Sequence, residues 1–162
     1  MFTIRAYSES DWPALWPILQ ETIRAGETYS YAPDSTAEQI HELWIRAPGA
    51  TFVACAASGE VLGSYFVKAN QPGLGSHVCN CGYIVASRAR GQGIAAAMCE
   101  HSQVQARAMG FRAMQFNFVV SSNRRAVRVW ESFGFEIVGR LPGAFHHPEL
   151  GDVDALVMYR LL

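Results

Sequence analysis

The sequence predicts a single domain of the α/β or α+β class, in which helices pack on a mixed β-sheet. Strand-like and helix-like segments follow one another in the order βααβββαβαββ, with one βαβ unit at the centre, and this alternation is typical of these classes. The 162 residues are an ordinary length for one domain, or at most for two very small ones. Because half of the residues are hydrophobic, the chain can bury a core, and we expect residues 1–162 to form one domain.

The order of elements follows from two kinds of local pattern. Apolar residues that alternate or run together between turn signals predict strands at residues 2–7, 51–57, 61–68, 77–85, 113–120, 135–141 and 154–161. Apolar residues at helical spacing, bounded by capping residues and glycines, predict helices at residues 11–25, 36–47, 91–110 and 123–133. The aromatic and polar segment 27–34 is expected to be irregular, and a long loop is expected between the last two strands.

Charge and cysteine content exclude some classes of protein. The formal net charge is −1, which argues against binding nucleic acid or a membrane surface through bulk positive charge and leaves open only a local basic patch. No apolar run approaches the ~20 residues that span a bilayer. The four cysteines follow no CxxC spacing, which favours reduced thiols over a metal or redox site. We therefore expect a cytoplasmic protein with no metal, no nucleic acid and no membrane partner.

The turn that follows the strand at 77–85 is the most informative part of the sequence. The turn carries Gly91 and Gly93 and leads into a long helix. Glycines let a backbone approach a ligand closely, and the first N–H groups of a helix have no partner within it. The helix dipole and the side chains of Arg88 and Arg90 add positive charge. The turn therefore predicts a site for a pyrophosphate group.

Two established phosphate motifs are excluded at this turn. A dinucleotide-binding GxGxxG motif needs a third glycine where this chain has Ala96. A P-loop needs a lysine in the turn, and the one lysine of the chain is Lys68. Taken alone, two glycines before a helix are also compatible with a tight turn that binds nothing.

A second segment, residues 123–135, strengthens the interpretation. Asn123 precedes a helix with one apolar side, and Gly134 and Phe135 lead into the next strand. Together, the patterns Arg-x-x-Gly-x-Gly at 88–93 and Asn-x-x-Ala-x-x-Val-Trp-x-x-x-Gly-Phe at 123–135 resemble the GNAT superfamily of N-acetyltransferases. The resemblance extends over nearly the whole chain, because the order and spacing of the elements are also similar. It implies a mostly antiparallel central sheet with flanking helices, and acetyl transfer from acetyl-CoA to an amine by direct attack.

The resemblance also implies which residues bind acetyl-CoA, the cosubstrate. The pyrophosphate lies on the turn and the helix start, which here are Arg88, Arg90, Gly91, Gln92, Gly93, Ile94 and Ala95. The pantetheine arm pairs with main-chain groups at the end of the preceding strand, which here are Tyr83, Ile84 and Val85. Asn123 contacts the cofactor, and a main-chain N–H of the strand polarises the thioester carbonyl. The cluster of Arg124, Arg125 and Arg128 either attracts the 3′-phosphate or is a solvated helix face.

One position departs from the pattern of the family. Many members carry a tyrosine in the later helix, where its hydroxyl can protonate the departing CoA thiolate, and this chain has Trp130 there. An indole N–H is a poor proton source. The thiolate therefore leaves unassisted or takes its proton from water, because a thiol pKa near ~8.5 makes it a tolerable leaving group.

The acceptor is expected between the two parted central strands that the resemblance implies. Asn80 and Asn117 stand as amides in otherwise apolar strands, and a buried amide without hydrogen bonds costs about 1–3 kcal/mol. These two amides either orient a small substrate and a catalytic water or satisfy the neighbouring backbone. Glu27 is a candidate to accept the proton of the amine through water, and an ordinary solvated carboxylate is the alternative.

Aromatic and histidine residues complete the set of candidates. Tyr29 and Tyr31 are expected on a loop that covers the acceptor pocket. His146, beside His147, lines the same pocket, contributes to a dimer contact or lies on the surface of the loop. His101 is expected to be a hydrogen-bonded core residue on the apolar side of the long helix. A strong base is not required, since desolvation of an ammonium lowers its pKa.

The sequence resembles two branches of the family that act on small amino-acid-like molecules. Asn80, Asn117 and Asn123 are similar to the arrangement in yeast azetidine-2-carboxylate N-acetyltransferases, and Glu27 with Thr28 is similar to the phosphinothricin and methionine-sulfoximine acetyltransferases. We therefore predict N-acetylation of a small amino acid or amino-acid analogue by a homodimer. The alternatives are acetylation of a peptide or protein N-terminus, and a non-catalytic acyl-CoA-binding sensor.

Overall fold

A seven-stranded sheet forms the centre of the structure, a computed structural model that describes residues 1–162. Its strands are β1 (Phe2–Ala6), β2 (Ala50–Ala56), β3 (Val61–Ala69), β4 (Val78–Val85), β5 (Ala113–Val120), β6 (Glu136–His147) and β7 (Gly151–Leu161). They lie in the order β1-β2-β3-β4-β5-β7-β6, and every neighbouring pair is antiparallel except β4 and β5. This mixed, mostly antiparallel sheet confirms the predicted fold class.

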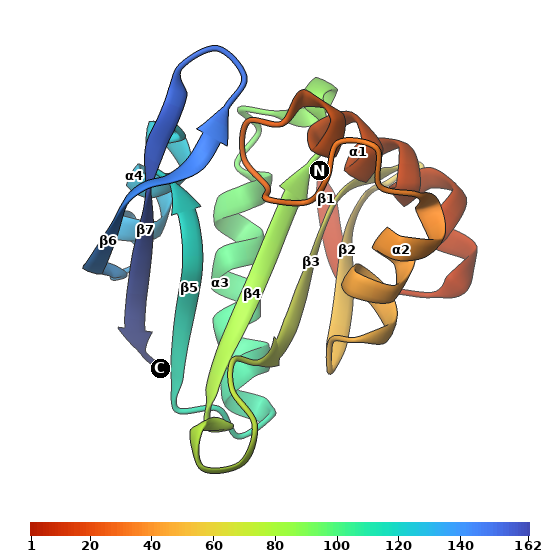
Figure 1. Cartoon of the computed structure of the whole chain (residues 1–162). Helices are drawn as coiled ribbons and strands as arrows, with labels where there is room; N and C mark the ends of the chain where they lie inside the picture. Colours follow the sequence, from red (N-terminus) through yellow and green to blue (C-terminus); the bar gives the residue numbers. More distant parts are fainter.

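Helices cover both faces of the sheet (Figure 1). They are α1 (Trp12–Ala25), α2 (Ala37–His41), α3 (Ile94–Ala108) and α4 (Arg124–Ser132). The side chains of β3 separate the two faces, since Ser64 bonds to Trp44 beyond α2 and Tyr65 bonds to His101 of α3. One face therefore carries α1 and α2, and the other carries α3 and α4. No helix of the chain combines the length and apolarity that a membrane span requires.

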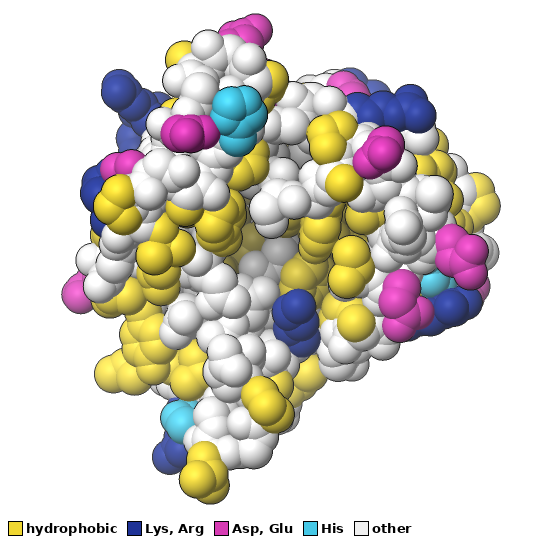
Figure 2. Space-filling view, in the orientation of Figure 1, with side chains coloured by type: hydrophobic (Ala, Val, Ile, Leu, Met, Phe, Trp, Pro, Cys, Tyr) yellow, Lys and Arg dark blue, Asp and Glu magenta, His cyan; other side chains and the backbone are white.

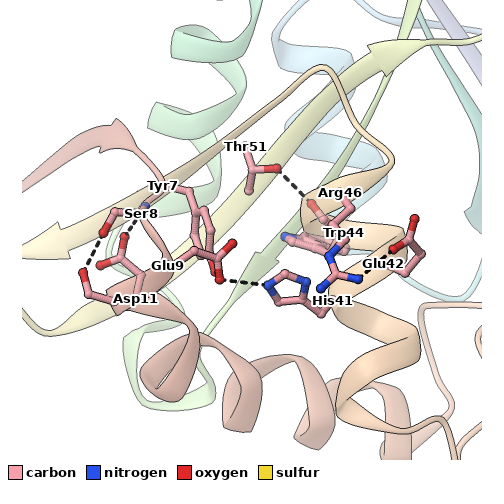
Figure 3. A network of polar contacts seen from close by, with 10 residues as sticks. Tyr7, Ser8, Glu9, Asp11, His41, Glu42, Trp44, Arg46 and Thr51 are labelled. Atoms are coloured by element: carbon pink, nitrogen blue, oxygen red, sulfur yellow. Dashed lines mark hydrogen bonds and ion pairs between the residues drawn. The ribbon is translucent and has the colours of Figure 1, made fainter.

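The segment that contains α2 is fixed to the sheet by a short chain of hydrogen bonds, of which Figure 3 shows the bond from Thr51 to Trp44. Trp44 is fully buried and donates its indole N–H to Ser64 Oγ at 3.1 Å. Ser64 donates in turn to the carbonyl oxygen of Phe52 at 2.8 Å, and Thr51 donates to the carbonyl oxygen of Trp44 at 2.9 Å. Buried polar groups that are satisfied in this way hold one arrangement. The part of the chain between α2 and β2 is thereby held against the sheet.

Two predicted elements differ in the structure. The second predicted helix, 36–47, is regular only in α2, because the last part widens into a π turn in which Ala47 N–H bonds to the carbonyl oxygen of Glu42. The long loop predicted between the last strands is wrong, since β6 and β7 continue into a hairpin with a short tip. Register shifts in β6 interrupt the alternation of side chains between the two faces of the sheet. The sequence pattern therefore does not reveal that the two strands extend this far. Pro142 is tolerated because β6 lies at the edge of the sheet.

The one parallel pair of the sheet is also the shortest. β4 and β5 pair only through Val78 with Ala113 and Cys79 with Met114, and the two strands then part. The carbonyl oxygen of Val78 accepts from the N–H of Asn70, the residue after β3, and the N–H of Ala86 donates to Leu62 of β3. Because main-chain groups alternate in direction along a strand, the odd-numbered residues after Cys79 turn their N–H groups toward the gap. The remainder of β4 therefore offers an unpaired edge toward β5.

Four buried free cysteines lie in the core and the sheet. Burial raises the pKa of Cys99 to about 12, which keeps its thiol protonated. Cys81 is buried between Cys79 and Tyr83, and burial likewise raises the pKa of its thiol. These inert thiols agree with the reduced cysteines predicted from the sequence.

Candidate active site

A cavity of about 680 Å³ opens where β4 and β5 part, and Figure 2 shows the hollow on this face of the molecule. Residues from β3, β4, β5, the segment after α1, and the starts of α3 and α4 line it. We call the part formed by Arg90, Gly91, residues 93–96, Asn123 and Arg125 the turn end. We call the part formed by residues 27–31, Phe66, Lys68, Asn80 and Asn117 the acceptor end. One continuous cavity joins the two ends.

The turn end is built mainly from backbone. Gly91 and Gly93 have φ of 83° and 78°, values in the left-handed region that glycine adopts without strain. The N–H groups of residues 91–93 and of the first turn of α3 have no acceptor within the protein. The 15 residues of α3 direct the positive end of the helix dipole to the same place. This arrangement fits the phosphate site that the sequence predicts.

Basic side chains at the turn end differ from those expected. Arg90 lines the cavity, and Arg125 lies across the turn, where its guanidinium would be 3.4 Å from a Cβ added at Gly91. Arg88 does not line the cavity, since it bonds to Glu60 at 2.6 Å and to the carbonyl oxygen of Val61.

Gln92 likewise does not line the cavity, and its side chain donates to the carbonyl oxygen of Arg88 at 3.4 Å. The remaining predicted cofactor residues do line it: Tyr83, Ile84, Val85, Arg90, Gly91, Gly93, Ile94, Ala95 and Asn123. Asn123 also accepts a hydrogen bond from Ala126 N–H at 3.3 Å and so caps α4. Its side-chain NH₂ has no acceptor in the protein. The structure therefore places the side chains of Arg88 and Gln92 outside the cavity, unlike the prediction, while the N–H of Gln92 stays without an acceptor.

The middle of the cavity is bordered by the unpaired edge of β4. The N–H groups of Cys81, Tyr83 and Val85 face this side, while the carbonyl oxygen of Tyr83 accepts a hydrogen bond from Tyr29 at 2.7 Å. Gly82 lies between these residues, and a Cβ there would be 2.5 Å from the ring of Phe66. Only glycine leaves β4, Phe66 and Tyr29 in this close arrangement.

An aromatic group closes the cavity toward α3 and α4. The ring of Tyr83 lies 4.8 Å from that of Trp130, which is 8% exposed and also contacts Phe116. Burial raises the pKa of Tyr83 well above its ordinary value, and the hydroxyl bonds to Ser102 at 2.7 Å. Trp130 of α4 therefore borders the cavity. The hydroxyl of Tyr83 is held in a hydrogen bond on the α3 side of β4.

Asn80 and Asn117 both line the acceptor end, but they do not bond to each other. Asn80 donates to the carbonyl oxygen of Gln115 at 2.9 Å and so spans the gap between β4 and β5. Asn117 is exposed and bonds to Asn70 and Gln115. The Oδ1 atom of Asn80 accepts no hydrogen bond from the protein. Of the two amides, Asn80 is the one with an unused polar atom at the parting strands.

The segment after α1 covers the acceptor end, as predicted. In Figure 1 it passes in front of the upper part of β4. Tyr29 and Tyr31 line the cavity with their rings stacked 5.4 Å apart, and Tyr29 packs edge-on against Trp44. Glu27 lines the cavity, is exposed and forms no ion pair. The structure thus brings the three predicted residues of this loop to one site.

The histidines lie outside the cavity. His146 is 81% exposed in the β6–β7 hairpin and bonds to Asp152 at 2.7 Å, so the prediction that it lines this pocket is corrected. His147 is buried and accepts hydrogen bonds from two N–H groups of the hairpin tip. His101 is half-buried and bonds to the hydroxyl of Tyr65 at 2.6 Å, which confirms the predicted hydrogen bond but not a place in the fully buried core, and burial lowers its pKa. No group of three or more His, Cys, Asp or Glu side chains forms a metal-binding cluster.

Lys68 is a cavity residue that the sequence interpretation missed as a site residue. In the sequence, its position outside the glycine turn served only to exclude a P-loop. The signal that would have found it is the alternation of residues 61–68, which places Lys68 on the face of β3 that carries Ser64 and Phe66. In the register of β3 and β4, Lys68 lies directly opposite Asn80.

Comparison with known proteins agrees with this geometry. Residues 12–135 match the family model described as the acetyltransferase (GNAT) family. The chain belongs to the GNAT acetyltransferase family. Membership makes this domain an acetyl-CoA-dependent acyltransferase of the GNAT type. The glycine turn at residues 88–93 and α4 with its N-cap Asn123 are both within the matched region.

Relatives of this GNAT domain are known by sequence and by structure. It is 32% identical over 108 residues to N-acetyltransferase aca1 of Schizosaccharomyces pombe, a match that covers 57% of this chain and 52% of that protein. The chain thus spans about half the length of this curated relative. A GCN5-related N-acetyltransferase from Kribbella flavida has 44% identity and a TM-score of 0.95, over 99% of this chain and 98% of that one.

A phosphinothricin acetyltransferase from Sinorhizobium meliloti, solved in complex with acetyl-CoA, shares the fold. Its TM-score is 0.85 at 22% identity, and the match covers 99% of this chain and 88% of that one.

Proposed function

We propose that this GNAT domain transfers the acetyl group of acetyl-CoA to the amine of a small amino acid or amino-acid analogue by direct attack. The observation that carries the proposal is the single cavity that joins the unpaired N–H groups of the turn end to Asn80 and the covered acceptor end. A donor held at one end and an acceptor held at the other would meet along the unpaired edge of β4. Holding two reactants together lowers the barrier without a covalent intermediate on the protein.

The turn end fits the diphosphate of acetyl-CoA. N–H groups without acceptors and the positive end of the α3 dipole favour an anion, and Arg90 and Arg125 add positive charge beside them. Asn123 adds an amide with unused donors. These residues bind and orient the donor, while β4 offers unpaired main-chain groups along which its arm lies.

The edge of β4 supports the chemical step. As the amine nitrogen bonds to the thioester carbon, negative charge develops on the carbonyl oxygen, and an N–H group of Cys81 or Tyr83 stabilises it. The C–S bond then breaks and the CoA thiolate leaves. Trp130 and the bonded hydroxyl of Tyr83 supply no proton, so the thiolate takes one from water. The proton of the amine passes to water beside Glu27.

The shape of the acceptor end favours a small acceptor. The stacked Tyr29 and Tyr31 lie across this part of the cavity, and Phe66 fills the space beside Gly82. A polypeptide chain would need an open groove at this point. The similarity in fold to a phosphinothricin acetyltransferase agrees with an acceptor that resembles an amino acid.

Titration calorimetry with acetyl-CoA and a thiol-release assay over a panel of amino acids, amines and peptides test the proposal. We expect micromolar binding of acetyl-CoA and CoA release with at least one free amino acid or analogue. Release with peptides alone would replace the proposal with an N-terminal acetyltransferase. Binding with no release on any amine would replace it with an acyl-CoA sensor.

The cytoplasmic location and the homodimer stay predictions. Light scattering after size-exclusion chromatography measures the oligomeric state.

A further inference from the structure

The one lysine of the chain lies at the acceptor end of the cavity. Lys68 is half-buried near the end of β3, and its cross-strand neighbour in β4 is Asn80. Directly opposite residues on one face of a sheet have Cβ atoms about 5 Å apart. The ammonium group is 5.5 Å from the centre of the Phe66 ring, a cation–π contact that keeps it beside the cavity.

Lys68 has no counter-ion in the protein. None of the six ion pairs of the chain includes it, and it makes no side-chain hydrogen bond. The amides of this end of the cavity, Asn80 and Asn117, are uncharged, and its carboxylate, Glu27, forms no ion pair with Lys68. A half-buried ammonium beside neutral groups is favoured when an anion joins it. Lys68 therefore carries a positive charge that no negative group of the protein pairs with.

This charge is separate from those that serve the diphosphate. Arg90 and Arg125 line the turn end. Asn80, opposite Lys68, and Val85, which leads into the turn, are five residues apart in β4, or about 16 Å at about 3.3 Å per residue. An anion at Lys68 would therefore belong to the acceptor rather than to acetyl-CoA.

Asn80 provides the complementary group. Its NH₂ donates to the carbonyl oxygen of Gln115, which can only accept, so this bond fixes the orientation of the amide. Asn80 Oδ1 then points away from the carbonyl oxygen of Gln115 and receives no hydrogen bond from the protein. An ammonium or amine is the kind of group that this oxygen would accept from. A positive group on β3 thus lies beside an acceptor atom on β4.

We propose that Lys68 binds the carboxylate of the acceptor, so that the domain selects free amino acids over their carboxamides, simple amines and peptide N-termini. The inference rests on the proposed function and names the group that decides its specificity. Lys68 forms the ion pair with the carboxylate, and Asn80 Oδ1 accepts from the nitrogen that attacks the thioester. The neutral carboxamide of the same amino acid keeps the amine and loses the ion pair.

Kinetics with matched pairs of substrates test this role. For each amino acid that supports CoA release, kcat/KM is measured for the free acid and for its carboxamide. We expect the wild-type domain to prefer the free acid by at least tenfold. Lys68→Met should lower kcat/KM for the free acid about 10- to 100-fold, leave the carboxamide within about twofold, and leave the affinity for acetyl-CoA unchanged.

Two variants control for charge and for folding. Lys68→Arg should retain the preference, because it keeps a cation at the site. Arg107→Met removes an exposed cation near the C-terminal end of α3 and should change neither substrate. Equal use of acid and carboxamide by the wild-type domain, or an unchanged preference in Lys68→Met, would overturn the role of Lys68 while the proposed function stands. Release of CoA with neither acids nor carboxamides would overturn both.

Discussion

The two ends of the cavity are built in different ways. At the turn end, the groups without partners are mainly backbone N–H groups from six consecutive residues, 91–96, which the glycines Gly91 and Gly93 allow to converge. At the acceptor end, the groups are side chains from a loop and three strands that are far apart in the sequence. Under the proposed function, backbone donors bind the diphosphate of acetyl-CoA, whereas the side chains of the acceptor end can be replaced one at a time by mutation. The difference indicates where specificity resides.

The largest effect should come from a change at the turn end. Gly91→Glu places a carboxylate against N–H groups and Arg125, where the diphosphate would lie. We expect the Kd for acetyl-CoA to rise about 100-fold or more, or roughly 2.7 kcal/mol. Titration calorimetry measures this change.

Gly59→Glu is the matched control for Gly91→Glu. Gly59 has φ of 87°, close to that of Gly91, but lies in the β2–β3 hairpin with open space around it. The backbone strain is therefore the same in both variants, and only the position differs. Equal affinity of the two variants for acetyl-CoA would contradict the placement of the phosphate site.

A smaller effect, confined to catalysis, should follow from changes at the acceptor end. In the double variant Asn80→Ala and Asn117→Ala, we expect kcat/KM for the acceptor to fall about 10- to 100-fold with the Kd for acetyl-CoA unchanged. The loss corresponds to about 1–3 kcal/mol from hydrogen bonds at a partly buried site. Steady-state kinetics and calorimetry separate the two quantities.

Asn123→Ala supplies the contrast for this double variant. It removes an amide of the turn end and the cap of α4, so it should weaken acetyl-CoA binding. Wild-type turnover in the double variant would remove both amides from the mechanism.

The smallest effect should come from the cover of the acceptor end. Tyr29→Phe removes the hydrogen bond to the carbonyl oxygen of Tyr83, and burial raises the pKa of Tyr29 so far that its hydroxyl is always a donor near neutral pH. We expect the KM of the acceptor to rise about three- to fivefold. The free energy of unfolding should fall by about 0.5–1.5 kcal/mol. Kinetics and urea denaturation measure the two effects.

Tyr31→Phe is the control for the cover. Tyr31 stacks on Tyr29, but its hydroxyl forms no hydrogen bond within the protein. If the two variants behave alike, the bond to β4 does not hold the cover in place, and the aromatic stack alone does.

The same contrast explains what could be predicted from the sequence. The turn at 88–93 and the helix after Asn123 are local patterns, because glycines and a capping residue act on their immediate neighbours. Their positions are therefore confirmed. The aromatic cover at Tyr29 and Tyr31 was also predicted, because its composition excludes a regular element.

The side-chain positions that could not be predicted depend on tertiary contacts. Arg88 was expected at the phosphate site, but its side chain bonds instead to Glu60, which is 28 residues away in the sequence. His146 was expected in the pocket because the β6–β7 hairpin was interpreted as a loop. Lys68 and Asn80 become neighbours only through the pairing of β3 with β4. Such partners can be found only after the register of the strands is known.

The parting of β4 from β5 also bears on how such a protein changes over evolutionary time. The groups that β4 turns toward the gap belong to the main chain, so mutation of Cys81, Tyr83 or Val85 alters packing against α3 without deleting a donor. A half-paired strand therefore keeps its function as long as it stays a strand. Drift in side chains can redirect the choice of acceptor while the means of handling the acyl donor is inherited intact.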